Sequence, residues 1–184
     1  MPSVLRSEIR NGRLTLLAAL TVEPKLSLSG ELARAFEAHH ELVFRTAYRV
    51  TGNAADAEDV LQTIFLRLLG RQERDAVENE ASYLRRAAVN ASLDLIRARR
   101  EDHAAEYGDI GSGARDPDAG ELRAALRRAL GRLNPKSAEI FTLRFLEGFS
   151  NQEIARLLGI SRVLVAVTVH RARRQLQHEL RDYR

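Results

Sequence analysis

The chain has 184 residues, of which 29% are charged and 45% are hydrophobic, a balance typical of globular proteins and not of disordered ones. It contains no cysteine, so it can form neither a disulfide nor a thiolate metal site, which agrees with a reducing cytoplasm. No apolar run approaches the roughly 18 residues of a membrane span. We therefore expect a cytoplasmic protein without membrane insertion.

The net charge of +4 is distributed unevenly along the chain. Residues 101–120 contain one basic and six acidic residues, whereas residues 121–184 contain thirteen basic and six acidic residues. A basic C-terminal block behind an acidic spacer suggests a nucleic-acid partner for that block. The alternative is an arginine-rich helical surface that faces solvent, and the charge alone favours neither.

The N-terminal half shows helical periodicity, and no strand pattern persists anywhere in the chain, so we predict an all-α fold. The first helix carries apolar residues from Phe36 to Val50 and ends at Gly52. A second helix begins near Ala54, where acidic residues in the first turns suit the helix dipole. A polar loop follows at 70–80, and a third helix covers roughly residues 81–100.

Residues 101–120 are acidic, contain four glycines and one proline, and show no periodicity, which predicts a flexible linker. The linker divides the chain into two small helical domains, residues 31–100 and 121–184. Residues 1–30 form an N-terminal extension whose pattern indicates no role.

The second domain ends in a predicted helix-turn-helix motif. After a helix at 121–133, Asn134 and Pro135 indicate the start of the next helix. The segment from Ser150 to Glu153 is a capping box that begins a short helix. Gly159 makes a tight turn, and Ser161 caps a last helix that continues to about Leu180. Helix, tight turn and helix together indicate a DNA-binding motif.

The last helix has a predicted buried face and a predicted DNA-reading face. The buried stripe consists of Val165, Val169, Ala172 and Leu176, which pack against Ile154 and Leu158. On the opposite face, Val163, Ala166 and Val167 cannot hydrogen-bond to a base edge, but they can pack on thymine methyl groups. We assign polar readout to Thr168, His170 and Arg171, and phosphate binding to Arg162, Arg173 and Arg174. The alternative is that the apolar patch faces a partner protein.

No pattern in the chain indicates catalysis. It has no phosphate loop, no metal-ligand spacing and no paired catalytic carboxylates. His39 and His40 are adjacent, and neighbours at i and i+1 do not face one another on a helix. We predict that the protein is not an enzyme and uses neither a metal nor a cofactor.

Three motifs in order resemble the bacterial RNA polymerase sigma factors. The stretch LVFRTAYRVTGNAADAEDVLQTIFLRLL resembles their core-polymerase-binding segment, whose hallmark is a D-A-E-D-hydrophobic-hydrophobic-Q pattern. The stretch SYLRRAAVNASLDLIRARR resembles the helix that melts and reads the −10 element. The stretch LNPKSAEIFTLRFLEGFSNQEIARLLGIS, followed by VHRARRQL, resembles the −35-binding domain. With two domains and a match over about residues 31–180, the chain is similar to the extracytoplasmic-function (ECF) subfamily of the sigma-70 family.

The resemblance implies a transcription initiation factor that binds core RNA polymerase, directs it to specific promoters and helps to melt the −10 region. It places contacts with the clamp helices of the largest polymerase subunit at Asp56, Glu58, Asp59, Gln62 and Phe65. It places −10 contacts at Arg85, Arg86, Asn90, Asp94, Arg97, Arg99 and Arg100. The polymerase flap and an anti-sigma factor are further partners that the resemblance implies, since many relatives are held inactive by such a factor.

Other segments acquire roles from the same resemblance. The loop from Arg71 to Glu80 matches the loop that captures a flipped base, and Tyr83 stands where the family commonly has tryptophan. Tyr83 either supports this loop or fills the core. The acidic linker matches the connector that lies in the RNA channel of the polymerase, and the alternative is a solvated tether.

The chain departs from the pattern of many relatives at four positions of the last helix, which are Leu164, Ala166, Val167 and Thr168. These departures leave the fold assignment intact but place inherited −35 contacts in doubt.

Two other functions remain open. One is a stand-alone helix-turn-helix regulator, against which the core-binding motif argues. The other is a degenerate sigma factor that acts as a protein-interaction module.

Overall fold

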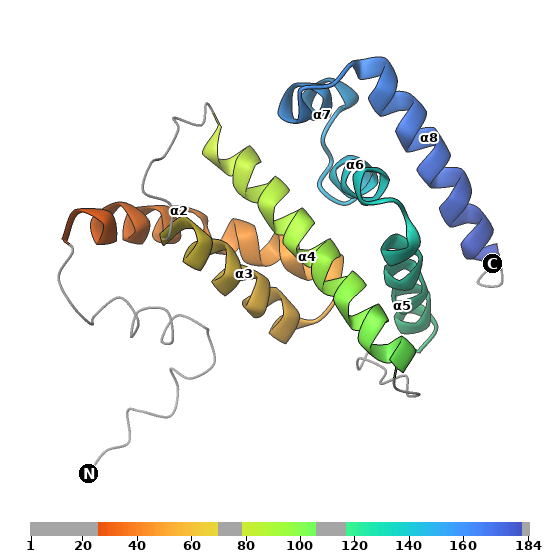
Figure 1. The fold of residues 1–184 in the computed structure, drawn as a ribbon, viewed down its shortest axis with the longest axis horizontal. Helices are drawn as coiled ribbons and strands as arrows, with labels where there is room; N and C mark the ends of the chain where they lie inside the picture. Colours follow the sequence, from red (N-terminus) through yellow and green to blue (C-terminus); the bar gives the residue numbers. More distant parts are fainter. Residues whose placement is uncertain (1–25, 70–78, 106–116, 182–184) are drawn as a thin grey trace, which may run out of the picture.

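A computed structural model describes residues 26–69, 79–105 and 117–181. Within these ranges every regular element is a helix (Figure 1), so the predicted all-α fold is confirmed there. The helices are α2 (Leu26–Thr51), α3 (Ala54–Leu69), α4 (Glu80–Ala105), α5 (Pro117–Arg132), α6 (Pro135–Phe145), α7 (Asn151–Leu158) and α8 (Arg162–Glu179).

Local sequence signals set most of the helix ends. Gly52 separates α2 from α3 with a φ of 66°, and the Asn53 side chain accepts a hydrogen bond from the Ala55 backbone N–H at 2.8 Å. The side chain of Asn134 caps α6, with Pro135 in its first turn. Ser150 and Glu153 form the predicted capping box at the start of α7. These short-range predictions are therefore confirmed.

Two helices extend beyond the predicted domain boundaries. Helix α4 continues to Ala105 and α5 already begins at Pro117, so both enter the segment 101–120 that we predicted as linker. Helix α2 begins at Leu26, inside the predicted N-terminal extension. The remainder of the predicted linker, residues 70–78 of the predicted loop at 70–80, and residues 1–25 lie outside the described residues.

Helices α2, α3 and α4 form one bundle with its own apolar core. Buried side chains of all three helices meet there, and Phe36 packs edge-on against Phe65 with ring centroids 4.9 Å apart. Leu84 and Ala88 supply the contribution of α4 to this core, and both are fully buried. This face of α4 accounts for the apolar periodicity predicted for the third helix.

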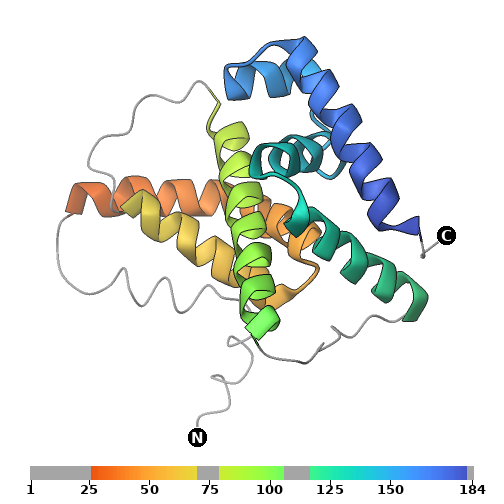
Figure 2. The same cartoon turned by 45° about the vertical axis from the view of Figure 1, so that its right-hand side comes forward.

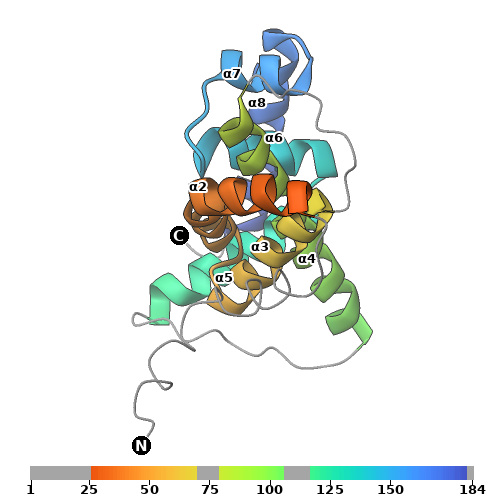
Figure 3. The same cartoon turned by 90° about the vertical axis from the view of Figure 1, so that its left-hand side faces the viewer.

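A second core joins the two halves of the chain. Val50 from α2 and Val89 and Leu93 from α4 pack with buried residues of α5 to α8, among them Leu130 and Ile140. Helix α4 therefore lies between the α2–α3 pair and the α5–α6 pair (Figure 2). Helix α7 and the start of α8 project at one end of the molecule (Figure 3). The halves that the sequence presents as separate domains thus share buried surface.

Two buried carboxylates of the C-terminal half face polar groups of the N-terminal half. The side chain of Glu147, just after α6, is only 1% exposed and accepts hydrogen bonds from Thr46 Oγ1 at 3.0 Å and from Arg49 Nη1 at 2.9 Å. The side chain of Glu139 on α6 is 7% exposed and accepts a hydrogen bond from Arg86 Nε at 2.7 Å. Paired in this way, the two charges tolerate burial.

The hydrogen bonds on Glu139 determine its protonation. Burial alone would raise the pKa of its carboxyl group, but hydrogen bonds from Arg86, Asn90 and Lys136 outweigh that effect and lower the pKa. A carboxyl group with a lowered folded-state pKa stabilises the folded state at every pH above its unfolded pKa. That contribution disappears as the pH falls through the folded-state pKa.

We expect acidification to destabilise the wild-type protein more than the Glu139→Gln variant, because glutamine cannot be protonated in this range. The difference between their free energies of unfolding should stay constant from neutral pH down to the ordinary glutamate range, about pH 4.3, and shrink below it. Urea unfolding over a pH series measures this difference. A difference that does not change with pH would contradict the role assigned to the Glu139 charge.

We expect Gly52→Ala to destabilise the protein more than Gly148→Ala does. Both glycines have a positive φ, 66° and 76°, so an alanine costs about 1 kcal/mol or more at either position. A Cβ at Gly148 would meet nothing within 4 Å, whereas a Cβ at Gly52 would lie 2.4 Å from Arg127 Nη1 on α5. That guanidinium must then move away from Asp56, whose charge it faces. Urea unfolding measures the free energy of unfolding of both variants. Equal decreases would show that the Arg127 side chain moves aside without a cost in stability.

Candidate nucleic-acid interface

The helix-turn-helix is built as the sequence predicts. Gly159 ends α7 in the left-handed conformation with a φ of 64°, and Ser161 Oγ accepts a hydrogen bond from the Leu164 backbone N–H at 3.1 Å. The buried stripe of α8 packs on Ile154 of α7, and its members are Val165, Ala172 and Leu176, with Val169 partly buried beside them. This packing fixes which side of α8 faces outward.

The outward side of α8 begins with large exposed apolar side chains. Val163 is 73% exposed, Leu164 is 51% exposed and Val167 is 39% exposed. The other predicted DNA-reading residues are also exposed except for Thr168, which is half-buried; they are Arg162, Ala166, His170, Arg171, Arg173 and Arg174. Sequence reasoning did not assign Leu164 to this surface, although its position outside the buried stripe was a sufficient signal.

Arg173 lies apart from the centre of this surface. It lines an open groove of about 260 Å³ together with residues of α5 and α6, including Leu122, Leu126 and Phe141. Val163, Val167 and Arg174 lie on the other side of α8, opposite the buried stripe. The structure therefore gathers most of the predicted −35 residues on one face and places Arg173 at its flank.

The predicted −10 residues on α4 are engaged with the protein itself. Asn90 Nδ2 donates to Glu139 Oε1 at 3.1 Å, the same oxygen that Arg86 contacts. Arg100 Nη1 donates to the Gly131 carbonyl oxygen at 3.2 Å. The guanidinium of Arg85 lies 5.8 Å from the centroid of the Phe149 ring. These four side chains of α4 thus contact the C-terminal half of the chain.

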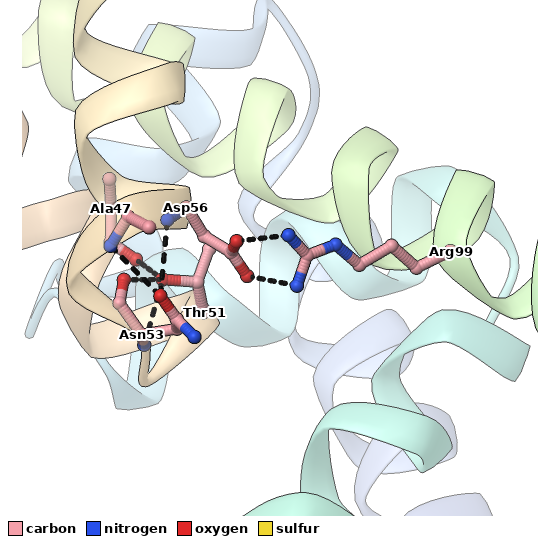
Figure 4. Close-up of polar contacts among 6 residues, drawn as sticks. Ala47, Thr51, Asn53, Asp56 and Arg99 are labelled. Atoms are coloured by element: carbon pink, nitrogen blue, oxygen red, sulfur yellow. Dashed lines mark hydrogen bonds and ion pairs between the residues drawn. The ribbon is translucent and has the colours of Figure 1, made fainter. Parts of the chain in front are cut away.

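The other three predicted −10 residues have partners inside the N-terminal bundle. Arg97 Nη1 pairs with Asp94 at 2.9 Å. The two terminal nitrogens of the Arg99 guanidinium, Nη1 and Nη2, both donate to the Asp56 carboxylate of α3 (Figure 4), and Nη1 lies 2.7 Å from Asp56 Oδ2. Asp94 remains exposed, so its pairing with Arg97 leaves an oxygen open to solvent.

A pocket of about 500 Å³ opens between α3 and α4. Tyr83 lines it and also packs on the core of the α2–α4 bundle, so the core-filling use that the sequence left open is confirmed. Arg67, Arg86 and Asn90 supply polar groups, and Ile64 and Leu68 supply apolar walls. A pocket with an aromatic ring and convergent donors can take a flat, polar ring such as a base. Residues 71–78 of the loop predicted to capture that base lie outside the described residues.

The residues predicted to contact the polymerase divide into two groups. Phe65 is fully buried in the bundle core, and Asp56 is buried in its pair with Arg99. Burial raises the pKa of Asp56, against the opposing effect of the Arg99 guanidinium. Asp59 is exposed, and Glu58 and Gln62 are half-buried. Of the five predicted residues, only these last three present polar groups at the surface of α3.

The described ranges contain no group of three or more side chains that could hold a metal ion. No helix in them is long and apolar enough to cross a membrane.

Family comparisons match the two halves separately. Sigma-70 region 2 matches residues 35–101, and Sigma-70, region 4 matches residues 123–176. The RNA polymerase sigma-E factor of Streptomyces coelicolor is 35% identical over 144 residues, which cover 76% of this chain and 80% of that protein. The ECF RNA polymerase sigma factor SigE of Mycolicibacterium smegmatis is 32% identical over 153 residues, and the match spans 79% of this chain but only 58% of that protein.

A solved structure supports the same fold. The sigma factor RpoE of Bartonella quintana, crystallised with the anti-sigma factor NepR, superposes with a TM-score of 0.53 at 22% identity and covers 82% of this chain and 97% of that one. The order of the two regions, the identity to sequenced relatives and the shared helical arrangement agree. The chain belongs to the sigma-70 family of RNA polymerase sigma factors, in its extracytoplasmic-function group.

Proposed function

We propose that this transcription initiation factor uses three surfaces, namely α3 for core RNA polymerase, α4 for the −10 element and α8 for the −35 element. The observation that carries the proposal is the presence of region 2 and region 4 in order on one chain, with the reading face of α8 exposed. A factor of this kind selects promoters and helps to open them, and the polymerase performs the chemistry. Its place of action would be the cytoplasm.

Run-off transcription with purified core polymerase and pooled genomic fragments tests the whole proposal. New start sites that share upstream elements are the expected result. Polymerase binding without initiation would favour a sequestering protein-interaction module, and neither binding nor initiation would favour a stand-alone regulator. An anti-sigma partner is a related proposal, supported by the NepR complex of the Bartonella protein.

The −35 surface combines apolar contact with surrounding positive charge. Val163, Leu164 and Val167 expose their side chains at the front of α8, where the helix would enter the major groove. Arg171 and Arg174 are exposed one or two turns further along, and Arg162 is exposed at the helix start. Cations around an apolar centre suit DNA, because phosphates flank every base edge. We infer that the apolar centre reads thymine methyl groups.

Replacing thymine by deoxyuridine in the −35 element removes only the methyl group and leaves the hydrogen-bonding edge intact. We expect the wild-type protein to lose about fourfold in affinity for each methyl group that it buries, as one buried carbon is worth roughly 0.8 kcal/mol. Val167→Ala should bind the thymine promoter more weakly and respond less to the replacement. Promoter binding by the reconstituted holoenzyme measures both effects.

Arg171→Ala serves as the matched control on the same helix. It should weaken binding to both promoters while retaining the full response to deoxyuridine, because it leaves the apolar centre unchanged. A wild-type protein that binds both promoters equally would exclude methyl readout.

The polymerase-binding surface is proposed to centre on the surface residues of α3. Asp59 is exposed, with Glu58 and Gln62 beside it on the same helix, and a polar face of this kind suits docking on a coiled coil. Asp56 and Phe65 support this surface from beneath, since Arg99 holds Asp56 and the bundle core holds Phe65.

Asp59→Arg should reduce affinity for core polymerase by tenfold or more, roughly the effect of placing a like charge in a charged interface. Glu37→Arg makes the same charge change at an exposed position of α2 and is expected to bind polymerase as the wild type does. Competition with the unmodified protein for core polymerase measures the two affinities. Equal losses in both variants would show a general charge effect and no specific contact at Asp59.

A further inference from the structure

The apolar centre of α8, formed by Val163, Leu164 and Val167, carries no side chain that can form a hydrogen bond. Val163 is 73% exposed, Leu164 is 51% exposed and Val167 is 39% exposed. Val165 between them is buried, and Ala166 is exposed but offers only a methyl group. Any contact of these side chains with a base pair therefore depends on shape and apolar burial, and not on hydrogen bonds.

The charged surroundings of the apolar centre suit duplex DNA. Arg162 precedes it, Arg171 and Arg174 follow it, and all three residues are exposed. Val163 and Val167 stand about one helical turn apart, which is about 6 Å along the axis. Base pairs stack about 3.4 Å apart. The two valines would thus face about two neighbouring base pairs, while the arginines reach the flanking phosphates.

The helix-turn-helix lacks the side chain that marks a cytosine. In the major groove thymine presents an O4 acceptor and a C5 methyl group, whereas cytosine presents an N4 amino donor, which a carboxylate recognises. The one carboxylate of α8, Glu179, lies at its C-terminal end and pairs with Arg132 at 2.5 Å. The one carboxylate of α7, Glu153, accepts a hydrogen bond from the Ser150 N–H at 2.7 Å. Both carboxylates already hold a partner, and no other acidic residue lies between Ser150 and Leu180.

The nearest exposed polar side chain on α8 lies beyond the apolar centre. His170 is exposed three residues after Val167, about 4.5 Å further along the helix axis. That distance exceeds the spacing of stacked base pairs. Polar readout by His170 therefore concerns a different base pair from the one that Val167 faces.

We propose that the apolar centre recognises the C5 methyl group of a pyrimidine and does not distinguish the group at C4, so that it accepts 5-methylcytosine where it accepts thymine. 5-Methylcytosine carries its methyl group on the same ring atom as thymine, and both methyl groups lie in the major groove. Unmethylated cytosine offers no methyl group to bury. Methylation of cytosine at C5 would therefore create −35 elements for this protein. The proposal rests on the assignment of the exposed face of α8 to the −35 element.

Bases that differ only in the methyl group give the most direct comparison. Thymine and deoxyuridine form one such pair, and 5-methylcytosine and cytosine form the other, because the hydrogen-bonding edge stays the same within each pair. The wild-type protein should lose about fourfold in affinity within either pair for each methyl group that it buries. A loss within the thymine pair alone would show that the group at C4 is also recognised, and would overturn the proposal.

The test uses four pools of duplex DNA that share one randomised segment. The pools are copied with thymidine or deoxyuridine triphosphate, each combined with deoxycytidine or 5-methyldeoxycytidine triphosphate. Full-length protein, alone and with core polymerase, selects binders from each pool, and sequencing gives the enriched −35 motif. Where the ordinary pool yields thymine, the pool with both methylated pyrimidines should yield cytosine about as often. In the pool with deoxyuridine and 5-methylcytosine, the preference should reverse to cytosine, by about fourfold per position.

Two variants separate the apolar centre from exposed apolar surface in general. Val167→Ala removes two carbons from the centre and should reduce the response to the methyl group within both pairs. Leu122 is 44% exposed on α5, outside the helix-turn-helix, so Leu122→Ala should keep the full response. Circular dichroism checks that both variants fold. If the two variants respond alike, the assignment of methyl recognition to the apolar centre is overturned.

The outcomes separate this proposal from the proposed function. The same motif in all four pools, or no enrichment in any pool, overturns methyl recognition even if the holoenzyme initiates transcription. A reversal of the preference by a protein whose holoenzyme never initiates supports methyl recognition and refutes the initiation function.

Discussion

The structure depends on one helix that is buried on two sides. Helix α4 contributes Leu84 and Ala88 to the core of the N-terminal bundle, and Val89 and Leu93 to the core shared with the C-terminal half. At about 1.5 Å per residue, its 26 residues extend about 39 Å, long enough to contact α2, α3, α5 and α6. A helix buried in this way belongs to both cores.

The polar part of this packing depends on the pairing of its buried charges. Buried carboxylates at Glu139 and Glu147 are favourable only while their donors remain in place, and an unpaired buried charge is strongly destabilising. Arg86 is thus an internal partner of Glu139 as well as one of the residues predicted to contact the −10 element.

The first turns of α8 carry more apolar side chains than its buried stripe accommodates. The buried stripe uses Val165, Ala172 and Leu176, and the neighbouring Val163, Leu164 and Val167 cannot reach that core. Large apolar side chains exposed together require a partner, because contact with water is unfavourable. In the proposed function this partner is a major groove rich in thymine, whose phosphates the surrounding arginines would bind.

Short-range signals in the sequence determined the helix ends at Gly52, Asn134 and Gly159, the capping box and the two faces of α8, because each depends on residues within one or two turns. The sequence motifs also indicated the family. Only the tertiary structure decided where the polar residues of α4 point. Arg86 and Asn90 lie 53 and 49 positions from Glu139, and Arg99 lies 43 positions from Asp56. No local pattern specifies such pairs, since an arginine that suits a phosphate suits a carboxylate equally well. The sequence predicted the apolar periodicity of α4. Its second buried face, by contrast, exists only because α5 and α6 pack against it in the tertiary structure.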